Sequence, residues 1–275
     1  MPTKQERSSS IALRAVRPNA GVRSAYAKKL RALIDAMSKD MADAVMSVYR
    51  KDEPLIAQDA KLPAKKLSDV MAGVRKRWEK RFDEDSDQIS TWFAKTVKSS
   101  VTRQKRSAVK DSKIPSAFAV NFDKGRVSQD VFEAIVAQNA SLIKSIADKY
   151  LSDVEGLVMR SVTDGRDIKG LSQELQQRYN LTKRRADFIA RDQNNKATES
   201  LARAQDTQAG ITRGVWMHIG GKYTSRETHK KMDGEEFDLA EGLYDKDVDR
   251  KVMPGELPGC QCTYRPLFPK DIWKK

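Results

Sequence analysis

Apolar residues recur at three- and four-residue steps over most of the first 210 positions, and this spacing predicts long amphipathic helices. The first such stretch covers about residues 23–49 and the second about residues 67–110. The first apolar face consists of Leu30, Leu33, Ile34, Met37, Met41, Ala44, Val45 and Val48. The second consists of Val70, Val74, Trp78, Phe82, Ile89, Trp92, Phe93 and Val97. Pro54 and Pro63 separate the two helices, and a break near Asp83–Asp87 stays open as an alternative.

The middle of the chain continues the helical pattern after a boundary at Lys113–Pro115. Residues 128–162 predict one helix. Leu171–Arg178 and Thr182–Gln208 predict two more, the second with Thr182 as its N-terminal cap.

After Gly210 the helical period ends, and Gly, Pro, Trp and Tyr become common. Short strands and loops are the structure that such a pattern favours. We therefore expect a mainly α chain, with an elongated helical region followed by a small, compact α+β unit of strands and loops. Its parts are a flexible basic arm (1–20), a basic helical region (21–115), a helical middle region (116–209), the carboxy-terminal unit (210–269) and a tail (270–275).

The charge of the chain is concentrated in its first part. The 275 residues carry a formal net charge of +14, and residues 1–120 hold 26 Lys and Arg against 14 Asp and Glu. No stretch approaches the roughly 20 apolar residues of a membrane span, and the polar start resembles no signal peptide. With two cysteines the chain is not a disulfide scaffold either. A soluble intracellular protein with an anionic partner is the expectation.

Two basic runs are candidates for contact with nucleic-acid phosphates. They consist of Arg75, Lys76, Arg77, Lys80, Arg81, Lys95, Lys98, Arg103, Lys105 and Arg106, and Lys110 follows them. Binding through such residues would be independent of sequence and sensitive to salt. The alternative is a solvated helix face, because acidic residues at 83–87 interrupt the run. No helix-turn-helix, zinc-finger or aromatic-stacking pattern decides between the two.

The soft metal ligands of the chain are clustered. Its two histidines and two cysteines, His218, His229, Cys260 and Cys262, lie within 45 residues of one another. Imidazole and thiolate are preferred zinc ligands, and four of them close a tetrahedral structural site. The turns Pro254-Gly255 and Pro258-Gly259 would present the cysteines at a fixed place. Against zinc, Cys-x-Cys is not the usual spacing, and buried, hydrogen-bonded side chains are the alternative.

No catalytic constellation is complete in the sequence. A phosphate-binding glycine loop, a G-x-S-x-G elbow and an H-E-x-x-H motif are all absent. Cysteine nucleophilic chemistry would need His229 beside Cys260 or Cys262. We therefore expect no enzyme.

The order of motifs in the second half resembles a known family. It runs from Ile189–Gln193 through Ala197, Gly210, Trp216 and His218 to Ser225-Arg226-Glu227-Thr228-His229, Asp233-Gly234, Pro254-Gly255-Glu256 and Cys260-Gln261-Cys262. This order is similar to the head-morphogenesis, or minor capsid, proteins of tailed phages related to the F protein of phage Mu. The resemblance covers about residues 120–268. The residues that match the motif are Arg191, Trp216, Arg226, His229, Asp233, Gly234, Pro254 and Gly255.

The resemblance implies a low-copy structural protein of the phage head, near the portal vertex, acting in head assembly, genome packaging or delivery. It implies the portal protein as partner, then the major capsid or scaffolding protein, with non-specific contact to packaged DNA and no membrane. The protein would occupy the virion, and the host cytoplasm during assembly. Two other functions stay open: a non-virion nucleic-acid-binding protein, and a Cys/His hydrolase or nuclease. Structural zinc is the one candidate cofactor, with buried, hydrogen-bonded side chains as the alternative.

Overall fold

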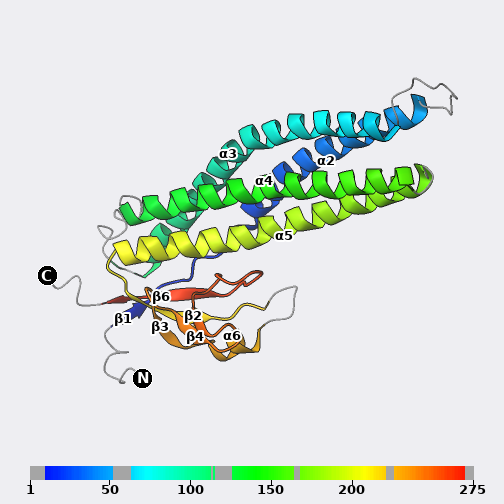
Figure 1. Ribbon diagram of the computed structural model, residues 1–275. Helices are drawn as coiled ribbons and strands as arrows, with labels where there is room; N and C mark the ends of the chain where they lie inside the picture. The colour runs from blue at the N-terminus through cyan, green and yellow to red at the C-terminus, as the bar shows by residue number, and fades with distance from the viewer. Residues whose placement is uncertain are drawn as a thin grey trace. The chain divides into compact units, whose positions relative to one another are not determined.

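The computed structural model describes residues 10–51, 63–112, 114, 126–163, 168–220 and 226–269. Four long helices contain more than half of the chain: α2 (Ala20–Lys51), α3 (Pro63–Asp111), α4 (Arg126–Thr163) and α5 (Ile168–Gln208) (Figure 1). The prediction of a mainly helical chain with a small carboxy-terminal strand region is confirmed. Among the described helices, none combines the length and the apolar character that crossing a bilayer would require.

The helix ends follow from local chemistry. The Asn19 side chain accepts hydrogen bonds from the backbone N–H groups of Gly21 and Val22, at 2.8 and 3.2 Å, and so caps α2. At the end of α5, Gly210 adopts a φ of 81°, and the Ile211 N–H returns to the Asp206 carbonyl at 2.9 Å. This left-handed glycine satisfies a terminal carbonyl and turns the chain toward the strands.

One expectation about the helices is wrong: α5 is one helix where two were expected. The alternative of a break near Asp83–Asp87 does not hold either, because α3 runs through these residues as one helix. Thr182 is inside α5, where its hydroxyl donates to the Arg178 carbonyl at 2.9 Å instead of capping a new helix. The physical reason is that no Gly or Pro lies between Leu171 and Gln208 to interrupt the backbone hydrogen bonds.

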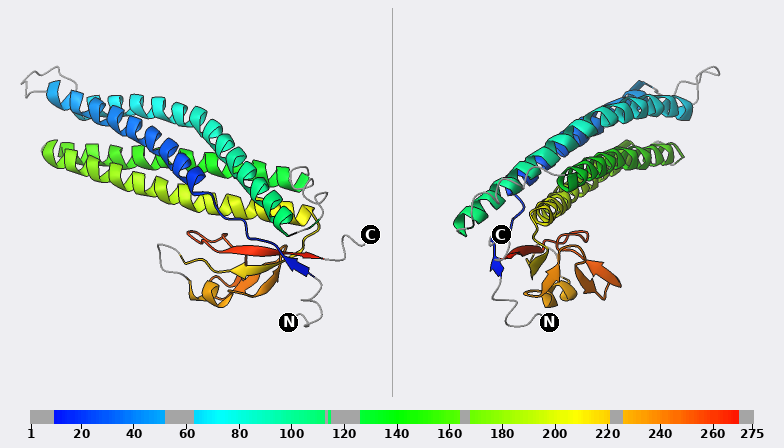
Figure 2. Two further views of the ribbon diagram at one scale, coloured as in Figure 1. Left: turned by 180° about the vertical axis from the view of Figure 1, so that it is seen from behind. Right: turned by 90° about the vertical axis from the view of Figure 1, so that its left-hand side faces the viewer.

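The described residues form two compact units, each built from separate parts of the chain. The first unit comprises Met1–Arg23, Trp92–Val136 and Arg191–Lys275, and the second comprises Ser24–Thr91 and Ala137–Ala190. In the second unit all four long helices contribute a section (Figure 2). Buried polar pairs join these sections, among them Tyr26 with Asn139 at 2.9 Å.

The first unit contains all the strands. β1 (Ser10–Ala12), β6 (Thr263–Pro269), β2 (Arg213–Met217) and β3 (Glu236–Asp238) form one antiparallel sheet in that order. β4 (Leu243–Asp245) and β5 (Arg250–Val252) form a separate hairpin. The short helix α6 (Glu227–Lys231) lies between β2 and β3 in the sequence.

The arm expected at residues 1–20 is ordered from Ser10 onward. Ser10–Ala12 pair with Leu267–Pro269, and Leu13 and Val16 are buried. Alternating apolar residues in Ser10–Val16 give this short stretch a buried face, which its polar surroundings hid from the sequence pattern. The remainder of the arm, residues 1–9, and the tail at 270–275 lie outside the described residues.

Candidate metal centre

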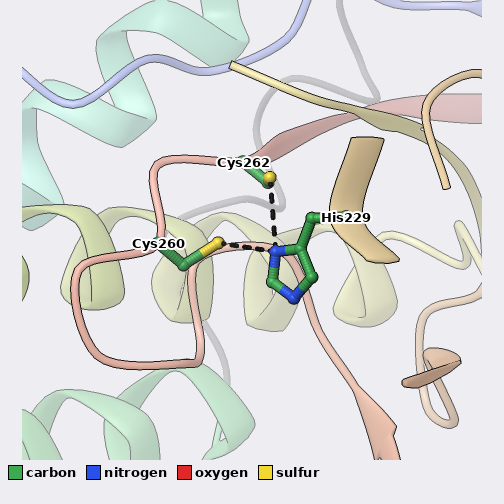
Figure 3. A group of neighbouring side chains, drawn as sticks. All are labelled: His229, Cys260 and Cys262. Carbon is green, nitrogen blue, oxygen red and sulfur yellow. Dashed lines mark hydrogen bonds between the residues drawn. The ribbon is translucent and has the colours of Figure 1, made fainter. Parts of the chain in front are cut away.

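Three of the four soft ligands converge in the interior of the first unit. His229 Nδ1 lies 3.3 Å from Cys260 Sγ and 3.6 Å from Cys262 Sγ (Figure 3). The three ligand atoms all lie within 4.8 Å of one another. The three side chains are at least 95% buried.

Separate elements bring these ligands together. Helix α6 supplies His229, and the loop before β6 supplies both cysteines. The loop is anchored to α5: the Gly259 N–H donates to the Asp192 carboxylate at 2.7 Å, and Asn195 donates to the Cys260 carbonyl at 3.2 Å. These bonds fix the cysteines before any ligand binds.

The two Pro-Gly turns shape the same loop. Gly255 and Gly259 have φ values of 75° and 74°, which favour glycine. At Gly255 a Cβ would also come within 2.7 Å of the Glu199 side chain. Arg226 donates to the Pro258 carbonyl at 3.1 Å and so holds the other side of the loop.

A carboxylate orients the histidine. His229 Nε2 lies 3.1 Å from Asp245 Oδ2, and Asp245 is fully buried at the end of β4. A carboxylate on the far nitrogen fixes the imidazole orientation and leaves Nδ1 facing the sulfurs, as it does in many zinc sites. The edge of the imidazole also packs on Trp216, with ring centroids 5.3 Å apart.

The environment favours a thiolate at Cys260. The hydrogen bonds from Cys262 and His229 lower the pKa of Cys260 to about 4, although burial opposes this shift. The same bond to Cys260, together with burial, raises the pKa of Cys262. Burial opposes protonation of His229, but the Cys260 sulfur and Asp245 outweigh it and raise the His229 pKa. One negative sulfur beside a histidine is thus the stable state of the cluster.

His218 lies at the edge of this cluster. Its Nδ1 is 3.5 Å from Cys262 Sγ, and its residue is only half-buried. It follows the end of β2, and the Asp233 carboxylate holds its backbone N–H at 2.8 Å. The imidazole of His218 thus reaches one of the two sulfurs.

The other motif residues have structural places around the cluster. Gly234 has a φ of 82°, and its N–H donates to the Trp216 carbonyl at 2.9 Å, closing the turn that Asp233 begins. Pro254 is buried in the loop, and Arg191 is half-buried on α5 next to Asp192. These residues position the ligands and do not themselves approach the sulfurs closely enough to join the group.

Asp245, Asp192 and Asn195 contact the cluster or its loop but were not among the predicted site residues. For Asp245 the sequence gives no signal, because it is one of several acids between Asp245 and Asp249. For the other two a signal exists: the polar run Asp192–Asn195 is buried on a helix. A run of polar side chains inside an apolar pattern indicates specific hydrogen bonds.

The ten candidate phosphate-binding residues fall into different environments. Arg75, Arg77, Lys80 and Arg81 each form an ion pair with a carboxylate. Lys105 does not face solvent: it is 4% exposed and is paired with the buried Asp206. Its prediction as a surface contact is wrong. Lys105 lies on the same inward-facing side of α3 as the buried residues Val101, Ala108 and Val109. Lys76, Lys95, Lys98, Arg103 and Arg106 remain at least partly exposed.

The fold and site thus define a helical protein whose carboxy-terminal unit encloses a His/Cys cluster. Residues 152–265 match the family described as Phage Mu protein F like protein, in agreement with the resemblance that the motif order indicated. The matched residues include His229, Asp245, Cys260 and Cys262.

A relative is found in Haemophilus influenzae. It is an uncharacterized protein that is 33% identical over 135 residues, which is 49% of this chain and 29% of the relative. The alignment therefore spans less than a third of that protein. No solved structure matches the chain.

Proposed function

We propose that this chain is a minor capsid protein that acts in head morphogenesis of a tailed bacteriophage. The observation that carries the proposal is the phage Mu F-like match over residues 152–265, which contains the whole His/Cys cluster. In this proposal the protein is a low-copy component of the virion near the portal vertex. It binds the portal protein and takes part in head assembly, genome packaging or delivery.

The cluster in this proposal holds a structural zinc ion. Tetrahedral zinc with Zn–S of about 2.3 Å and Zn–N of about 2.0–2.1 Å requires ligand atoms about 3.6 Å apart. The distances of 3.3 and 3.6 Å from His229 Nδ1 to the two sulfurs, and of 3.5 Å from His218 Nδ1 to Cys262 Sγ, agree with such edges. Cys260, Cys262 and His229 would be three ligands and His218 the fourth. The ion would tie α6 to the loop before β6.

The same geometry contains the parts of a cysteine nucleophile. Cys260, His229 and Asp245 follow one another at 3.3 and 3.1 Å, the arrangement of a thiol, its base and an orienting carboxylate. Two features favour the metal. A nucleophile must be reachable, whereas Cys260 is 5% exposed and His229 is 2% exposed. A nucleophile also needs one thiol, whereas two thiols share His229 Nδ1.

Zinc content tests the metal part. The full-length chain, purified without chelator, should carry close to one zinc per chain by elemental analysis. His229→Ala and Cys262→Ala should lose it, while Lys230→Ala, an exposed neighbour on α6, should keep it. Less than a tenth of a zinc per chain in the wild type would contradict the metal site. Rapid alkylation of Cys260 that His229→Ala abolishes would favour the nucleophile.

The assembly part is tested separately. Mass spectrometry of purified virions and procapsids should detect the chain at low copy relative to the major capsid protein. Deletion of its gene should lower the yield or infectivity of particles. Absence of the chain from both kinds of particle would contradict the role in the head, whatever the zinc content.

A further inference from the structure

Residues 92–110 of α3 carry positive charge and contain no acidic residue. Between Trp92 and Lys110 the chain has six Lys and Arg and no Asp or Glu. One of the six, Lys105, is buried against Asp206. The other five are exposed or half-exposed: Lys95, Lys98, Arg103, Arg106 and Lys110. Within the part of the chain that the structure describes, no ion pair joins Lys95, Lys98 or Arg103 to a carboxylate.

Four of these cations surround a hollow on one side of the helix. The hollow has a volume of about 670 Å³. Its lining is Lys95, Lys98, Ser99, Thr102, Arg103 and Arg106. These positions recur at three- and four-residue steps and therefore share a face. The Lys98 ammonium lies 5.7 Å from the centre of the Phe132 ring, which holds it at the border of the hollow.

The earlier part of α3 provides a contrast. Residues 75–87 contain five cations and five carboxylates. Arg75 pairs with Glu79 and Glu155, Arg77 pairs with Asp40, and Lys80 and Arg81 pair with acids one turn later. The two basic runs are therefore different surfaces. Four of the five cations in the first run pair with carboxylates, whereas Lys95, Lys98 and Arg103 of the second form no ion pair within the described residues.

We propose that the face of α3 formed by Lys95, Lys98, Ser99, Arg103 and Arg106 binds the phosphate backbone of double-stranded DNA. The cations of this face and the exposed Ser99 hydroxyl can donate hydrogen bonds to phosphate oxygens. From Lys95 to Arg106 the helix rises about 16 Å, enough to follow several phosphates of one strand. Because phosphates carry no sequence information, the binding shows no base preference.

The composition of the face favours DNA over an acidic protein. Protein interfaces are usually centred on buried aromatic or large apolar anchors. The exposed large apolar side chains in the described part of the chain are Val127, Leu181, Phe188, Tyr244 and Val248. None of them lies on residues 92–110. The face thus offers charge and a hydroxyl group without an apolar anchor.

The proposal does not depend on the role in the phage head. It is tested on the full-length chain with a fluorescently labelled 30-base-pair duplex, by anisotropy at several salt concentrations. A quadruple variant replaces Lys95, Lys98, Arg103 and Arg106 by Gln. A matched variant replaces Lys76, Arg77, Lys80 and Arg81 by Gln and so removes the same number of charges from the other run. Circular dichroism and thermal unfolding check that both variants fold.

We expect the first variant to lose at least tenfold in affinity, and the matched variant to lose less than threefold. The slope of log K against log salt should become shallower by up to about 3.6 in the first variant, since each of the four lost phosphate contacts contributes about 0.9. Equal losses in the two variants would show that net charge alone binds DNA, and would overturn the assignment. So would a wild type that does not bind the duplex, or that binds polyglutamate as tightly.

Discussion

Lys105 and Asp206 form an ion pair in the interior of the first unit, with side chains that are 4% and 1% exposed. The Tyr264 hydroxyl donates to the other Asp206 oxygen at 2.6 Å, so the pair links α3, α5 and β6. Burial lowers the pKa of Lys105, and the neighbouring carboxylate offsets part of this shift. A buried pair of this kind contributes specificity more than net stability, because both charges lose their water.

The first prediction concerns the two halves of this pair. Lys105→Met should lower the free energy of unfolding by about 3–5 kcal/mol, because it leaves Asp206 charged and unpaired. The double variant Lys105→Met, Asp206→Leu should recover much of the loss. Urea unfolding measures both. Lys110→Met, exposed in the last turn of α3, is the control and should change stability by less than about 0.5 kcal/mol. A double variant less stable than Lys105→Met would contradict the argument.

The second prediction concerns the carboxylate behind His229. Asp245→Asn should weaken zinc binding about 10–100-fold, because the imidazole loses the charged group that orients it. Competition with a chromogenic chelator gives the affinity. Asp249→Asn, an exposed change in the same loop, should leave the affinity unaltered. Equal affinities for wild type and Asp245→Asn would remove Asp245 from the site.

The third prediction is a pH dependence. Glu199 is 3% exposed, and burial raises its pKa, with Thr263 and Arg203 offsetting only part of the shift. The folded chain therefore keeps a proton that the unfolded chain releases above about pH 4.3, so that stability falls as pH rises from there toward the folded pKa. Glu199→Gln cannot ionise. Its stability relative to wild type should increase with pH, by at most about 1.4 kcal/mol per pH unit.

Urea unfolding between pH 5 and 8 measures this difference. The exposed Glu235→Gln should show no such trend. A constant difference between Glu199→Gln and wild type over this range would mean that Glu199 is ionised in the folded as well as in the unfolded chain, and would contradict the raised pKa.

The fourth prediction compares two glycines. Gly255→Ala should destabilise the first unit by about 1–3 kcal/mol, because φ is 75° and the new Cβ meets Glu199 at 2.7 Å. It should also lower zinc occupancy, since this loop presents the cysteines. Gly73→Ala, inside α3 with its nearest neighbour 3.8 Å away, should stabilise by up to about 1 kcal/mol. Thermal unfolding measures both stabilities, and zinc analysis measures the occupancy of the site. A destabilised Gly73→Ala would contradict the open space beside Gly73 on α3.

Local periodicity predicted the helices well. Leu30, Ile34 and Met37 are buried as expected, because a long apolar helix face is shielded from water by packing against other helices. The sequence did not predict that Leu171–Arg178 and Thr182–Gln208 belong to one helix. A threonine caps a helix only where the backbone before it is not helical, and the backbone before Thr182 is helical. The strand at Ser10–Ala12 was also missed, because its partner lies more than 250 residues away.

The candidate site was predictable in part. The clustering of two histidines and two cysteines in one segment predicted the approach of His229 to Cys260 and Cys262. Asp245 was not predictable, because side-chain partners depend on how β4 meets α6 in space. For the same reason the sequence did not predict that Arg75 would pair with Glu155 and Arg77 with Asp40, both distant in the chain.

The pairing of β1 with β6 sets a condition on how the chain is made. β6 lies between β1 and β2, and the core around it includes Leu13 and Val109. A piece limited to the phage Mu F-like residues 152–265 would leave one edge of β6 bare and part of that core unfilled. On the ribosome, likewise, the first strand must wait until residue 269 has been synthesised. The first unit is therefore expected to fold late and slowly for its size, since its contacts join the two ends of the chain.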